Sequence, residues 1–408
     1  MPTHIVIDAD GHCNEPDNEL AKWMPKELAH LAPSRVTDSS GYSHLMIEGR
    51  LAGRRRWGGG TDRCAVFASH IERSRPGMTD PLKRLPDMDE EGIDVAIIFG
   101  TSIALMVNGM ADKPLAAVIC HAVNRWLVEE YLAPDPKRLK GVGLIPVQDP
   151  PSAVKELEYL AQHRAIVTAM LPTNVYGINL GHRMFDPVYA AAQEIGMPLS
   201  VHPQTEHDGQ YGVWGVMGAG SERMEKYSYV HMTSFPFELM IALMHMIGEG
   251  VFDRYPKLKV GFMEGACGWL PFWMERLDEH FHKLGPQWPL LKRKPSEIIK
   301  SSQVAFTCEP EESILPYVLD TIGITQVMYA SDYRHWDSEF PDSVREVKKI
   351  PGMTEDQLRH VLGENARNWF NLKEGRMENR GSRTPILYLP FSILDSRLCI
   401  NASPPTPD

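Results

Sequence analysis

The 408-residue sequence has few cysteines and no excess of positive charge, and each shortage excludes a class of protein. Its six cysteines are scattered, without a Cys-x-x-Cys pair. This argues against a disulfide framework and for reduced thiols in a cytoplasmic setting. The 53 acidic residues outnumber the 42 lysines and arginines, which gives a formal net charge of −11. Because an acidic surface repels phosphate and anionic lipid, we expect neither nucleic acid nor a membrane as a partner.

Long apolar runs are also scarce. No run approaches the roughly 20 apolar residues needed to span a bilayer. The N-terminal MPTHIVIDADGH lacks the basic and apolar segments of a secretory signal, so we expect a strand there instead. Apolar residues still make up 43% of the chain and charged residues 23%, which is the balance of a globular protein. The length suits one large barrel with insertions or two ordinary domains.

Short apolar, β-branched runs recur along the chain, each followed by a longer stretch of helical period. Buried parallel strands are apolar throughout in this way. Alternation of strands and helices predicts an α/β fold, and a count of eight strands favours a (β/α)8 TIM barrel over a doubly wound sheet. The expected strands are 4–8, 95–99, 141–147, 166–171, 199–202, 258–263, 303–307 and 326–330. The expected helices are 115–131, 153–163, 187–195, 237–247, 270–284 and 313–320.

Two intervals are too long for simple connections and predict insertions. One follows the first strand and is rich in Gly, Arg and Pro, and the other, at 203–257, follows the fifth strand. Loops of such length are usually lids or binding loops. We therefore expect a barrel domain over 1–373 with a cap insertion at about 16–84. Residues 374–408, which are rich in Arg, Pro and Ser, are expected to form a C-terminal extension outside the barrel.

Residues of the type that bind metals stand at the ends of several predicted strands. In barrels of this class, the carboxyl ends of the strands converge on one face, which carries the functional side chains. Asp10 and His12 follow the first strand and, being two residues apart, project the same way. His202, Glu264 and Asp332 end the fifth, sixth and eighth strands. Mixed imidazole and carboxylate ligands suit Zn, Mn or Fe, so these five residues predict a metal centre.

Each of these residues also has a structural alternative when taken alone. Asp10 can cap a turn, and a histidine at a strand end such as His202 is often only hydrogen-bonded. Asp8 lies two residues before Asp10, so both would face the same side of a strand, and Asp8 is expected to be a supporting carboxylate. Glu15 is either a ligand that reaches back or one half of a loop ion pair. The metal prediction depends on the combination rather than on any one side chain.

Four further residues belong to the expected pocket. His231 precedes the helix before the sixth strand and is a ligand, a substrate contact or a core histidine. His335 lies three residues after Asp332 and either orients that carboxylate or lines the pocket. Glu309 directly follows the seventh strand, and Trp57 lies in the first insertion, whose loop is expected to close over the substrate.

Long stretches of the sequence resemble the amidohydrolase-related family, which includes α-amino-β-carboxymuconate-ε-semialdehyde decarboxylase and γ-resorcylate decarboxylase. The resemblance covers the chain to about Leu372. It implies a (β/α)8 barrel, a divalent metal and a homo-oligomer, either a dimer or a tetramer. The matching stretches are IDADGHCNEP at 7–16, RLPDMDEEGIDVAIIF at 84–99, FDPVYAAAQEIGMPLSVH at 185–202, FDRYPKLKVGFMEGACGWLPFWMERLDEH at 252–280, FTCEP at 306–310, YASDYRHWDSEFPDS at 329–343 and LGENARNWFNL at 362–372.

The resemblance also implies roles for individual residues. The typical first-strand motif of the family is His-x-His, whereas this sequence has Asp10-Gly11-His12, so its first ligand would be a carboxylate. The fifth-strand histidine falls on His202 and the eighth-strand aspartate on Asp332. Glu264 stands where the decarboxylases have a histidine that acts on the substrate or on metal-bound water. Decarboxylase activity is therefore not simply inherited.

These observations predict a metal-dependent hydrolase or carboxy-lyase that acts on a small carboxylated or carbonyl-containing molecule. Zinc is the expected ion, with iron or manganese as alternatives, and one or two ions per chain. Asp332 is the expected general base, and Glu264 or His231 would supply the proton in a decarboxylase. The donor set is also large enough for two irons, so a dinuclear non-haem iron oxygenase is the alternative.

Overall fold

The computed structural model describes residues 4–37, 43–51, 76–203, 218–219, 227–333, 335 and 337–372. All of them belong to one compact unit, His4–Leu372. The remaining unit, Met1–Thr3 with Lys373–Asp408, lies outside the described residues, as does Trp57. The domain boundary expected at residue 373 and the extension at 374–408 therefore stay predictions.

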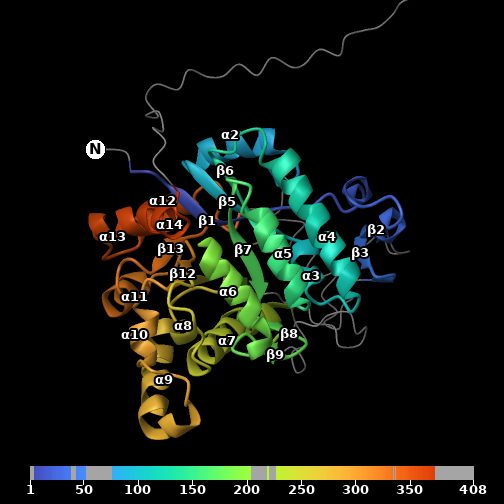
Figure 1. Ribbon diagram of the computed structural model, residues 1–408. Coiled ribbons are helices and arrows are strands. Elements are labelled where there is room, and N and C mark those ends of the chain that lie inside the picture. Colours follow the sequence, from blue (N-terminus) through green and yellow to red (C-terminus); the bar gives the residue numbers. More distant parts are fainter. Residues whose placement is uncertain are drawn as a thin grey trace, which may run out of the picture. The chain divides into compact units, whose positions relative to one another are not determined.

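Eight parallel strands form a single sheet whose spatial order follows the sequence (Figure 1). All eight strands expected from the sequence are present, and the prediction of a (β/α)8 barrel is confirmed. Their order is β1-β5-β6-β7-β10-β11-β12-β13. The strands are β1 (Ile7–Cys13), β5 (Val95–Gly100), β6 (Leu139–Leu144), β7 (Ile166–Pro172), β10 (Leu199–His202), β11 (Val260–Phe262), β12 (Val304–Cys308) and β13 (Val327–Tyr329).

The barrel closes between its last and first strands. A single parallel bridge pairs Gly11 with Tyr333. Beside it, the backbone N–H of Asp332 donates to the carbonyl of Asp10 at 2.9 Å. The closing contact of the barrel thus lies at two of the predicted metal ligands.

Helices alternate with the strands and pack around the sheet (Figure 1). Asp80 and Asp112 cap the first turns of α2 and α4, because each side chain accepts a hydrogen bond from a backbone N–H there. Gly92 and Gly196 end α2 and α6 in the left-handed conformation, which glycine adopts without strain. The helices are α2 (Pro81–Glu91), α3 (Ile103–Val107), α4 (Lys113–Trp126), α5 (Pro150–Leu160), α6 (Asp186–Ile195), α7 (Tyr227–Gly248), α8 (Val251–Arg254), α9 (Leu270–Leu284), α10 (Pro295–Ile299), α11 (Leu315–Ile322), α12 (Ser343–Lys349), α13 (Glu355–Arg359) and α14 (Asn365–Trp369).

Two small antiparallel sheets lie in the connections. The insertion after β1 contains three short strands, and a hairpin follows β7. The strands of the insertion are β2 (Ser34–Thr37), β3 (Ser43–Ile47) and β4 (Arg50–Leu51). The hairpin consists of β8 (Asn174–Val175) and β9 (Ile178–Asn179). The described part of the first insertion is therefore held together by hydrogen bonds between its own strands.

The helix α7 is the longest of the described helices. It corrects the expectation that no segment is long and apolar enough to span a bilayer. Its segment Ser228–Gly248 has the length and composition of a membrane span, although no such run stood out in the sequence. Polar residues such as Ser234 and Glu238 interrupt the segment, and both are buried. In total, 56% of the apolar window is buried inside the domain, as in a core helix of a globular protein.

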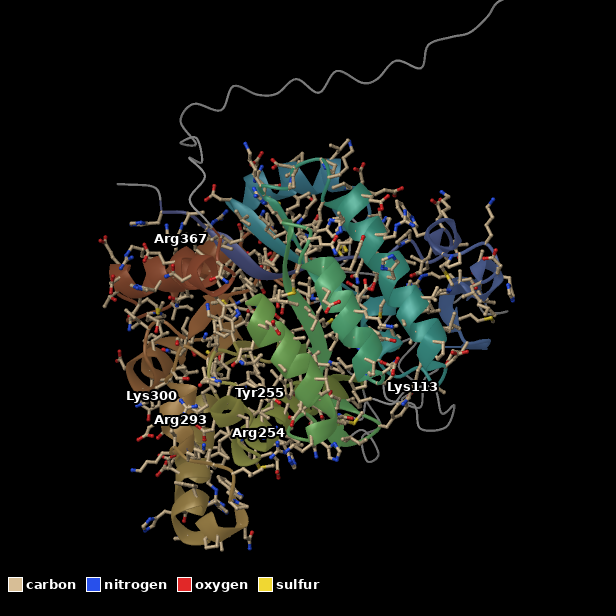
Figure 2. The ribbon with its side chains drawn as sticks, in the orientation of Figure 1. Lys113, Arg254, Tyr255, Arg293, Lys300 and Arg367 are labelled. Atoms are coloured by element: carbon tan, nitrogen blue, oxygen red, sulfur yellow. The ribbon has the colours of Figure 1, made fainter. Side chains whose placement is uncertain are left out.

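Ion pairs join the outer helices of the barrel. Arg254, at the end of α8, contacts Asp186 of α6 with Nη2 and Oδ1 2.6 Å apart. Arg293 contacts Asp253 of α8 with Nε and Oδ1 2.7 Å apart. Figure 2 shows Arg254 and Arg293 in the same part of the domain. These ion pairs link segments that are far apart in the sequence.

Candidate metal centre

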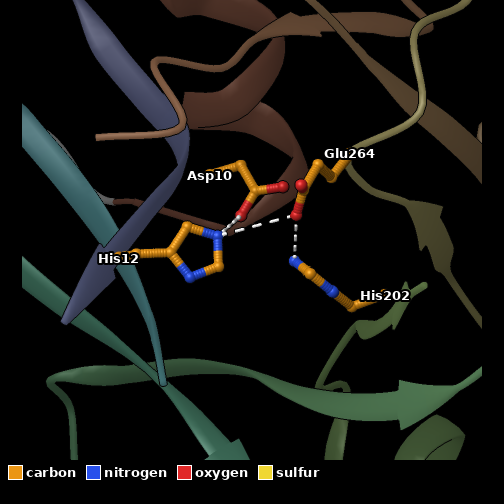
Figure 3. Close-up of side chains that lie close together, drawn as sticks. All are labelled: Asp10, His12, His202 and Glu264. Atoms are coloured by element: carbon orange, nitrogen blue, oxygen red, sulfur yellow. Dashed lines mark ion pairs between the residues drawn. The ribbon is translucent and has the colours of Figure 1, made fainter. Parts of the chain in front are cut away.

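Four of the predicted ligands converge at the carboxyl ends of three barrel strands (Figure 3). Asp10 and His12 belong to β1, His202 is the last residue of β10, and Glu264 follows β11 by two residues. His12 Nε2 lies 3.5 Å from Asp10 Oδ1 and 3.8 Å from Glu264 Oε2. His202 Nε2 lies 2.8 Å from Glu264 Oε2. Ligands of one ion with bonds of about 2.1 Å stand roughly 3 to 3.4 Å apart when adjacent and about 4.2 Å apart when opposite, so atoms 2.8 to 3.8 Å apart lie close to the arrangement of a shared ion.

The fifth predicted ligand, Asp332, adjoins this group. Its Oδ1 lies 3.4 Å from His12 Nε2 and 2.6 Å from His335 Nδ1. The rings of His12 and His335 are also close, with centroids 4.0 Å apart. The structure thus brings together all five residues that the sequence singled out as ligands, and it adds His335.

The strand β1 is longer than predicted. The sequence placed its end at Asp8, but the strand continues to Cys13, with an irregularity of register between Asp8 and Gly11. Gly11 leaves no room for a side chain, because a Cβ there would lie 2.5 Å from Asp8 Oδ2 and 2.6 Å from Arg84 Nη2. Because of this irregularity, Asp8 and Asp10 reach different surroundings despite their equal parity. Asp10 lies within the strand and does not cap a turn.

The buried donor atoms of the group lie close to one another but do not form well-aligned hydrogen bonds. None of six side-chain atoms makes a hydrogen bond of normal geometry with any other described residue. Buried polar atoms are nearly always satisfied, so six such atoms facing one another need an explanation. A divalent cation provides one, because it binds carboxylate oxygens and neutral imidazole nitrogens directly. The atoms are Asp10 Oδ1 and Oδ2, His12 Nε2, His202 Nε2, Glu264 Oε2 and Asp332 Oδ1.

Hydrogen bonds on the far side of the ligands orient them toward the centre. His202 Nδ1 lies 2.7 Å from the carbonyl of Pro203, and His12 Nδ1 lies 3.3 Å from Thr101 Oγ1. Because each contact holds Nδ1, the Nε2 atom of the ring faces the centre. Metal-binding histidines are usually oriented in this way. The backbone N–H of Glu264 donates to Thr307 Oγ1 at 2.9 Å.

The backbone is strained at two of the predicted ligands. Glu264 and Asp332 have φ values of +41° and +47°, and Ala266 has +57°. Residues with a Cβ avoid this left-handed region, and they keep it mainly where the surrounding structure serves a function. The strain turns both carboxylates inward just after their strands end.

Burial and mutual repulsion disfavour the charged carboxylates. Burial raises the pKa of Asp10 well above its usual range; Glu264 and Asp8 raise it further, while His202 and the nearby Glu264 amide oppose the shift. Burial likewise raises the pKa of Glu264, with a contribution from Asp337, and that of Asp332, where Glu264 adds to it. Burial lowers the pKa of both His12 and His202. The imidazoles are therefore neutral, which is the form that binds metals, and a cation would offset the crowded carboxylates.

A second buried network lies behind the centre. Asp8 accepts hydrogen bonds from the backbone N–H and the hydroxyl of Ser331, at 2.9 Å and 2.6 Å. Its Oδ2 lies 3.6 Å from Arg84 Nη2, and both side chains are fully buried. The guanidinium of Arg84 stacks 3.3 Å from the centre of the Tyr333 ring. Asp8 thus ties β1 to the segment that carries Asp332, which confirms its expected supporting role.

Glu15 has no ion-pair partner among the described residues, and its oxygens do not belong to the group of donor atoms at the centre. It is fully buried, and it accepts hydrogen bonds from the backbone N–H groups of Ser102 and Ala104 at 2.9 Å and 2.7 Å. Burial raises the pKa of Glu15, and Asp17 adds to the shift. Its role is to satisfy the N-terminal amides of α3.

The remaining pocket residues lie farther from the donor atoms. His231 belongs to α7, stacks on Phe235, and its Nε2 lies 3.7 Å from Asp337 Oδ2. Glu309 directly follows β12, and its side chain is exposed. Asp337 interacts with both Asp332 and His231, and the sequence analysis did not select it. Its position in the acidic run after His335 was the only signal for it.

Comparisons with known proteins agree with this architecture. The 2-amino-3-carboxymuconate-6-semialdehyde decarboxylase of Dictyostelium discoideum is 24% identical over 295 residues, which covers 72% of this chain and 77% of the relative. An amidohydrolase structure from Mycobacterium avium subsp. paratuberculosis K-10 superposes with a TM-score of 0.70 at 21% identity, covering 91% and 100% of the two chains. A dihydroxybenzoic acid decarboxylase structure from Polaromonas sp. JS666, with bound manganese and the inhibitor 2-nitroresorcinol, gives 0.64 at 18% identity, covering 91% and 98%. The two structures support the fold.

The comparisons also bear on the functional expectations. An enzyme of the amidohydrolase type is confirmed, whereas none of these relatives is named as an oxygenase, so the iron oxygenase alternative finds no support. The buried donors support a divalent ion without identifying it as zinc. A family model described as amidohydrolase matches residues 7–372, so the chain belongs to the amidohydrolase family.

Proposed function

We propose that the protein is a metal-dependent decarboxylase of a small carboxylated aromatic acid. The observation that carries the proposal is the set of six buried donor atoms without well-aligned hydrogen bonds at the carboxyl ends of the strands. Family membership and the decarboxylases among its relatives support the reaction class. The proposed ligands of the ion are Asp10, His12, His202 and Glu264, and Asp332, the fifth predicted ligand, is assigned to proton transfer.

We further propose that the ion is manganese rather than the zinc expected from the sequence. Two carboxylates and two imidazoles, with the carboxylate of Asp332 beside them, form a set rich in hard oxygen atoms. Such a set suits Mn²⁺, whereas closed zinc sites more often have nitrogen and sulfur ligands. Manganese in the Polaromonas enzyme supports this choice.

When bound, the ion supplies a Lewis acid that polarises a substrate oxygen. The neutral imidazoles of His12 and His202 hold the donor set in place from β1 and β10. Glu264 extends the carboxylate wall of the site and is 8% exposed. The exposed Glu309, together with Trp57 from the first insertion, is proposed to contact the aromatic ring.

Decarboxylation needs one proton at a defined carbon. The bond between the ring carbon and the carboxyl carbon breaks, CO2 leaves, and the electron pair left on the ring carbon takes a proton. We assign this proton to the carboxyl group of Asp332, which is 15% exposed and contacts His335 Nδ1 at 2.6 Å. Glu264 is a weaker candidate, because its Oε2 faces His202. His231 Nε2 lies 3.7 Å from Asp337 Oδ2, and Asp337 in turn interacts with Asp332.

The test uses purified, manganese-loaded protein and a panel of phenolic acids that includes 2,6-dihydroxybenzoate. We expect release of CO2 and, in D2O, a single deuterium on the carbon that lost the carboxyl group. Asp332→Asn should remove turnover, whereas the matched surface variant Asp135→Asn should not. Hydrolysis of ester or lactone substrates without any CO2 from the panel would contradict the proposal.

We also propose a cytoplasmic homo-oligomer, either a dimer or a tetramer. The four described cysteines, Cys13, Cys120, Cys267 and Cys308, are free and buried, which agrees with a reducing setting. Several large apolar side chains are exposed on α7, α9 and α11, namely Met232, Phe237, Phe272 and Tyr317. Light scattering on the purified full chain measures the subunit number, and a monomer at micromolar concentration would contradict the assembly.

A further inference from the structure

The segment 264–268, which joins β11 to α9, follows an unusual backbone path. Three consecutive residues, Glu264, Gly265 and Ala266, have φ values of +41°, +145° and +57°. Glycine adopts positive φ readily, but residues with a Cβ avoid it, so such a path persists only where neighbouring groups hold it. The direction of the Glu264 side chain therefore depends on the contacts that fix this segment.

The carboxylate of Glu312 holds the far end of the segment. Its Oε1 accepts hydrogen bonds from the backbone N–H groups of Cys267, at 2.8 Å, and of Gly268. Its Oε2 accepts from the Cys267 thiol, with the two atoms 3.4 Å apart, and from the backbone N–H of Glu309 at 3.3 Å. One partly buried side chain thus ties the loop after β11 to the loop after β12.

The near end of the segment is held by the same neighbouring strand unit. The backbone N–H of Glu264 donates to Thr307 Oγ1 at 2.9 Å, and Thr307 belongs to β12. The indole N–H of Trp269 also donates to two carbonyls of the segment, at 3.1 Å and 3.0 Å, but Trp269 lies in the same connection and would move with it. Thr307 and Glu312 therefore fix the segment from outside, one at each end.

Glu312 supports the centre without belonging to it. Its oxygens are not among the donor atoms that meet there. Burial raises the pKa of Glu312, whereas hydrogen bonds from Cys267, Glu309 and Gly268 oppose the shift. An apolar side chain in its place would leave the N–H groups of Cys267 and Gly268 without this acceptor, and unpaired backbone groups are costly. These contacts give a physical reason for an acidic residue at this position.

We propose that Glu312 is a positioning residue that fixes the segment 264–268 so that the carboxylate of Glu264 faces the centre. The inference rests on the proposed function, in which Glu264 is a ligand of the ion. Outer hydrogen-bond partners orient metal ligands and tune the affinity of the site. Here the support acts through the backbone of the loop that carries the ligand. Through the N–H of Glu309, the same carboxylate also fixes the loop that carries a proposed substrate contact.

The test compares Glu312→Ala and Glu312→Gln with the control Asp278→Ala in the full chain. Asp278 has a similar task at the start of α10, where it accepts hydrogen bonds from the backbone N–H and the hydroxyl of Ser296 at 2.9 Å and 2.6 Å. Calorimetric titration of the metal-free proteins with Mn²⁺ should give a Kd about 10- to 100-fold higher for Glu312→Ala than for wild type. Glu312→Gln keeps an oxygen that accepts both N–H groups, so it should recover much of the affinity. Asp278→Ala should bind Mn²⁺ as the wild type does.

Hydrogen–deuterium exchange of the metal-free proteins gives a second readout, which depends on neither an ion nor a substrate. The amides of Cys267 and Gly268 should exchange slowly in the wild type, because both donate to Glu312. In Glu312→Ala, exchange in a peptide over 264–269 should be about tenfold faster, since two hydrogen bonds are lost. Asp278→Ala should leave this peptide unchanged.

The outcomes separate a positioning role from a structural one. A lower melting temperature in Glu312→Ala with unchanged Mn²⁺ affinity would overturn the inference, as would an equal loss of affinity in Asp278→Ala. If Glu312→Ala does not fold, Glu312→Gln and the wild-type exchange decide: unprotected amides at Cys267 and Gly268 would overturn it. Mn²⁺ affinity that depends on Glu312, in a protein that releases no CO2, would support the inference while the proposed function fails.

Discussion

Asp8 and Asp10 are the same residue type on the same strand, and their surroundings differ completely. Asp8 accepts two hydrogen bonds from Ser331 and faces the guanidinium of Arg84. Asp10 is equally buried, but neither of its oxygens makes a hydrogen bond of normal geometry with a described residue. The irregularity in β1 between Asp8 and Gly11 separates the two environments.

The difference distinguishes a carboxylate that stabilises the fold from one that is kept for a ligand. A buried charge with a full set of partners loses stability when a partner is removed. A buried charge without partners costs stability until its ligand binds, which is a common feature of functional sites. The two aspartates should therefore respond in opposite ways to the same substitution.

The largest expected effect is the loss of turnover in Asp10→Asn. Removing a ligand weakens the binding of the ion that polarises the substrate. Because such an ion lowers the activation free energy by several kcal/mol, the rate should fall about 10³-fold or more. The Asp8→Asn variant should still bind the metal and should lose far less turnover. Turnover and metal content per chain, measured on both variants, check this. Equal losses in the two variants would break the distinction between them.

For the free energy of unfolding, the order of the two variants should be reversed. Asp8→Asn leaves the buried Arg84 without its counter-charge, and breaking such a pair costs about 3 to 5 kcal/mol. Metal-free Asp10→Asn should instead be as stable as the metal-free wild type, or more so. Urea denaturation of the three metal-free proteins measures both effects. The double variant Asp8→Asn/Arg84→Met should recover part of the lost stability, because it removes the stranded charge.

Metal binding should stabilise the wild type through Asp10 and its neighbours. At a free Mn²⁺ concentration 100 times Kd, the free energy of unfolding should increase by about 2.7 kcal/mol. Asp10→Asn should show little of this gain in stability. Asp8→Asn should show most of it, although its metal-free form is less stable than the metal-free wild type. Thermal unfolding with and without Mn²⁺ provides the comparison.

The smallest effect concerns pH. Burial raises the pKa of Asp10, Glu264 and Asp332 in the metal-free fold, so the folded state binds protons more tightly than the unfolded chain. The stability from these groups is complete below the ordinary carboxyl pKa of about 4 and is lost as pH rises through the raised values. Metal-free wild type should therefore lose stability from pH 4 upward more steeply than metal-free Asp10→Asn. Parallel pH profiles for the two proteins would contradict this.

The sequence allowed the ligands to be predicted because they follow local patterns. Apolar runs mark the strands, and the residues just after them must meet at one face of the barrel, where the structure brings Asp10, His202, Glu264 and Asp332 together. The predicted end of β1 falls short of the observed one because the polar residues Asp10 and His12 do not resemble those of a buried strand. They are tolerated there because each is satisfied by a partner or aimed at the centre.

Contacts between distant segments were not predictable in this way. Arg84 lies 76 positions from Asp8, and only the packing of α2 against the barrel brings the two together. The link from Asp337 to Asp332 and His231 depends on the path of the loop after β13, for which the sequence offers no periodic pattern. The role of Glu15 could not be predicted because its partners are backbone amides. Every residue type except proline has such an amide, so the sequence does not indicate the contact.

Anomalous X-ray diffraction from crystals of the manganese-loaded protein tests the central claim most directly. The account predicts a strong anomalous peak about 2.1 to 2.3 Å from side-chain donor atoms of Asp10, His12, His202 and Glu264. Density for water alone among these side chains at saturating Mn²⁺, with no anomalous signal there, would contradict it.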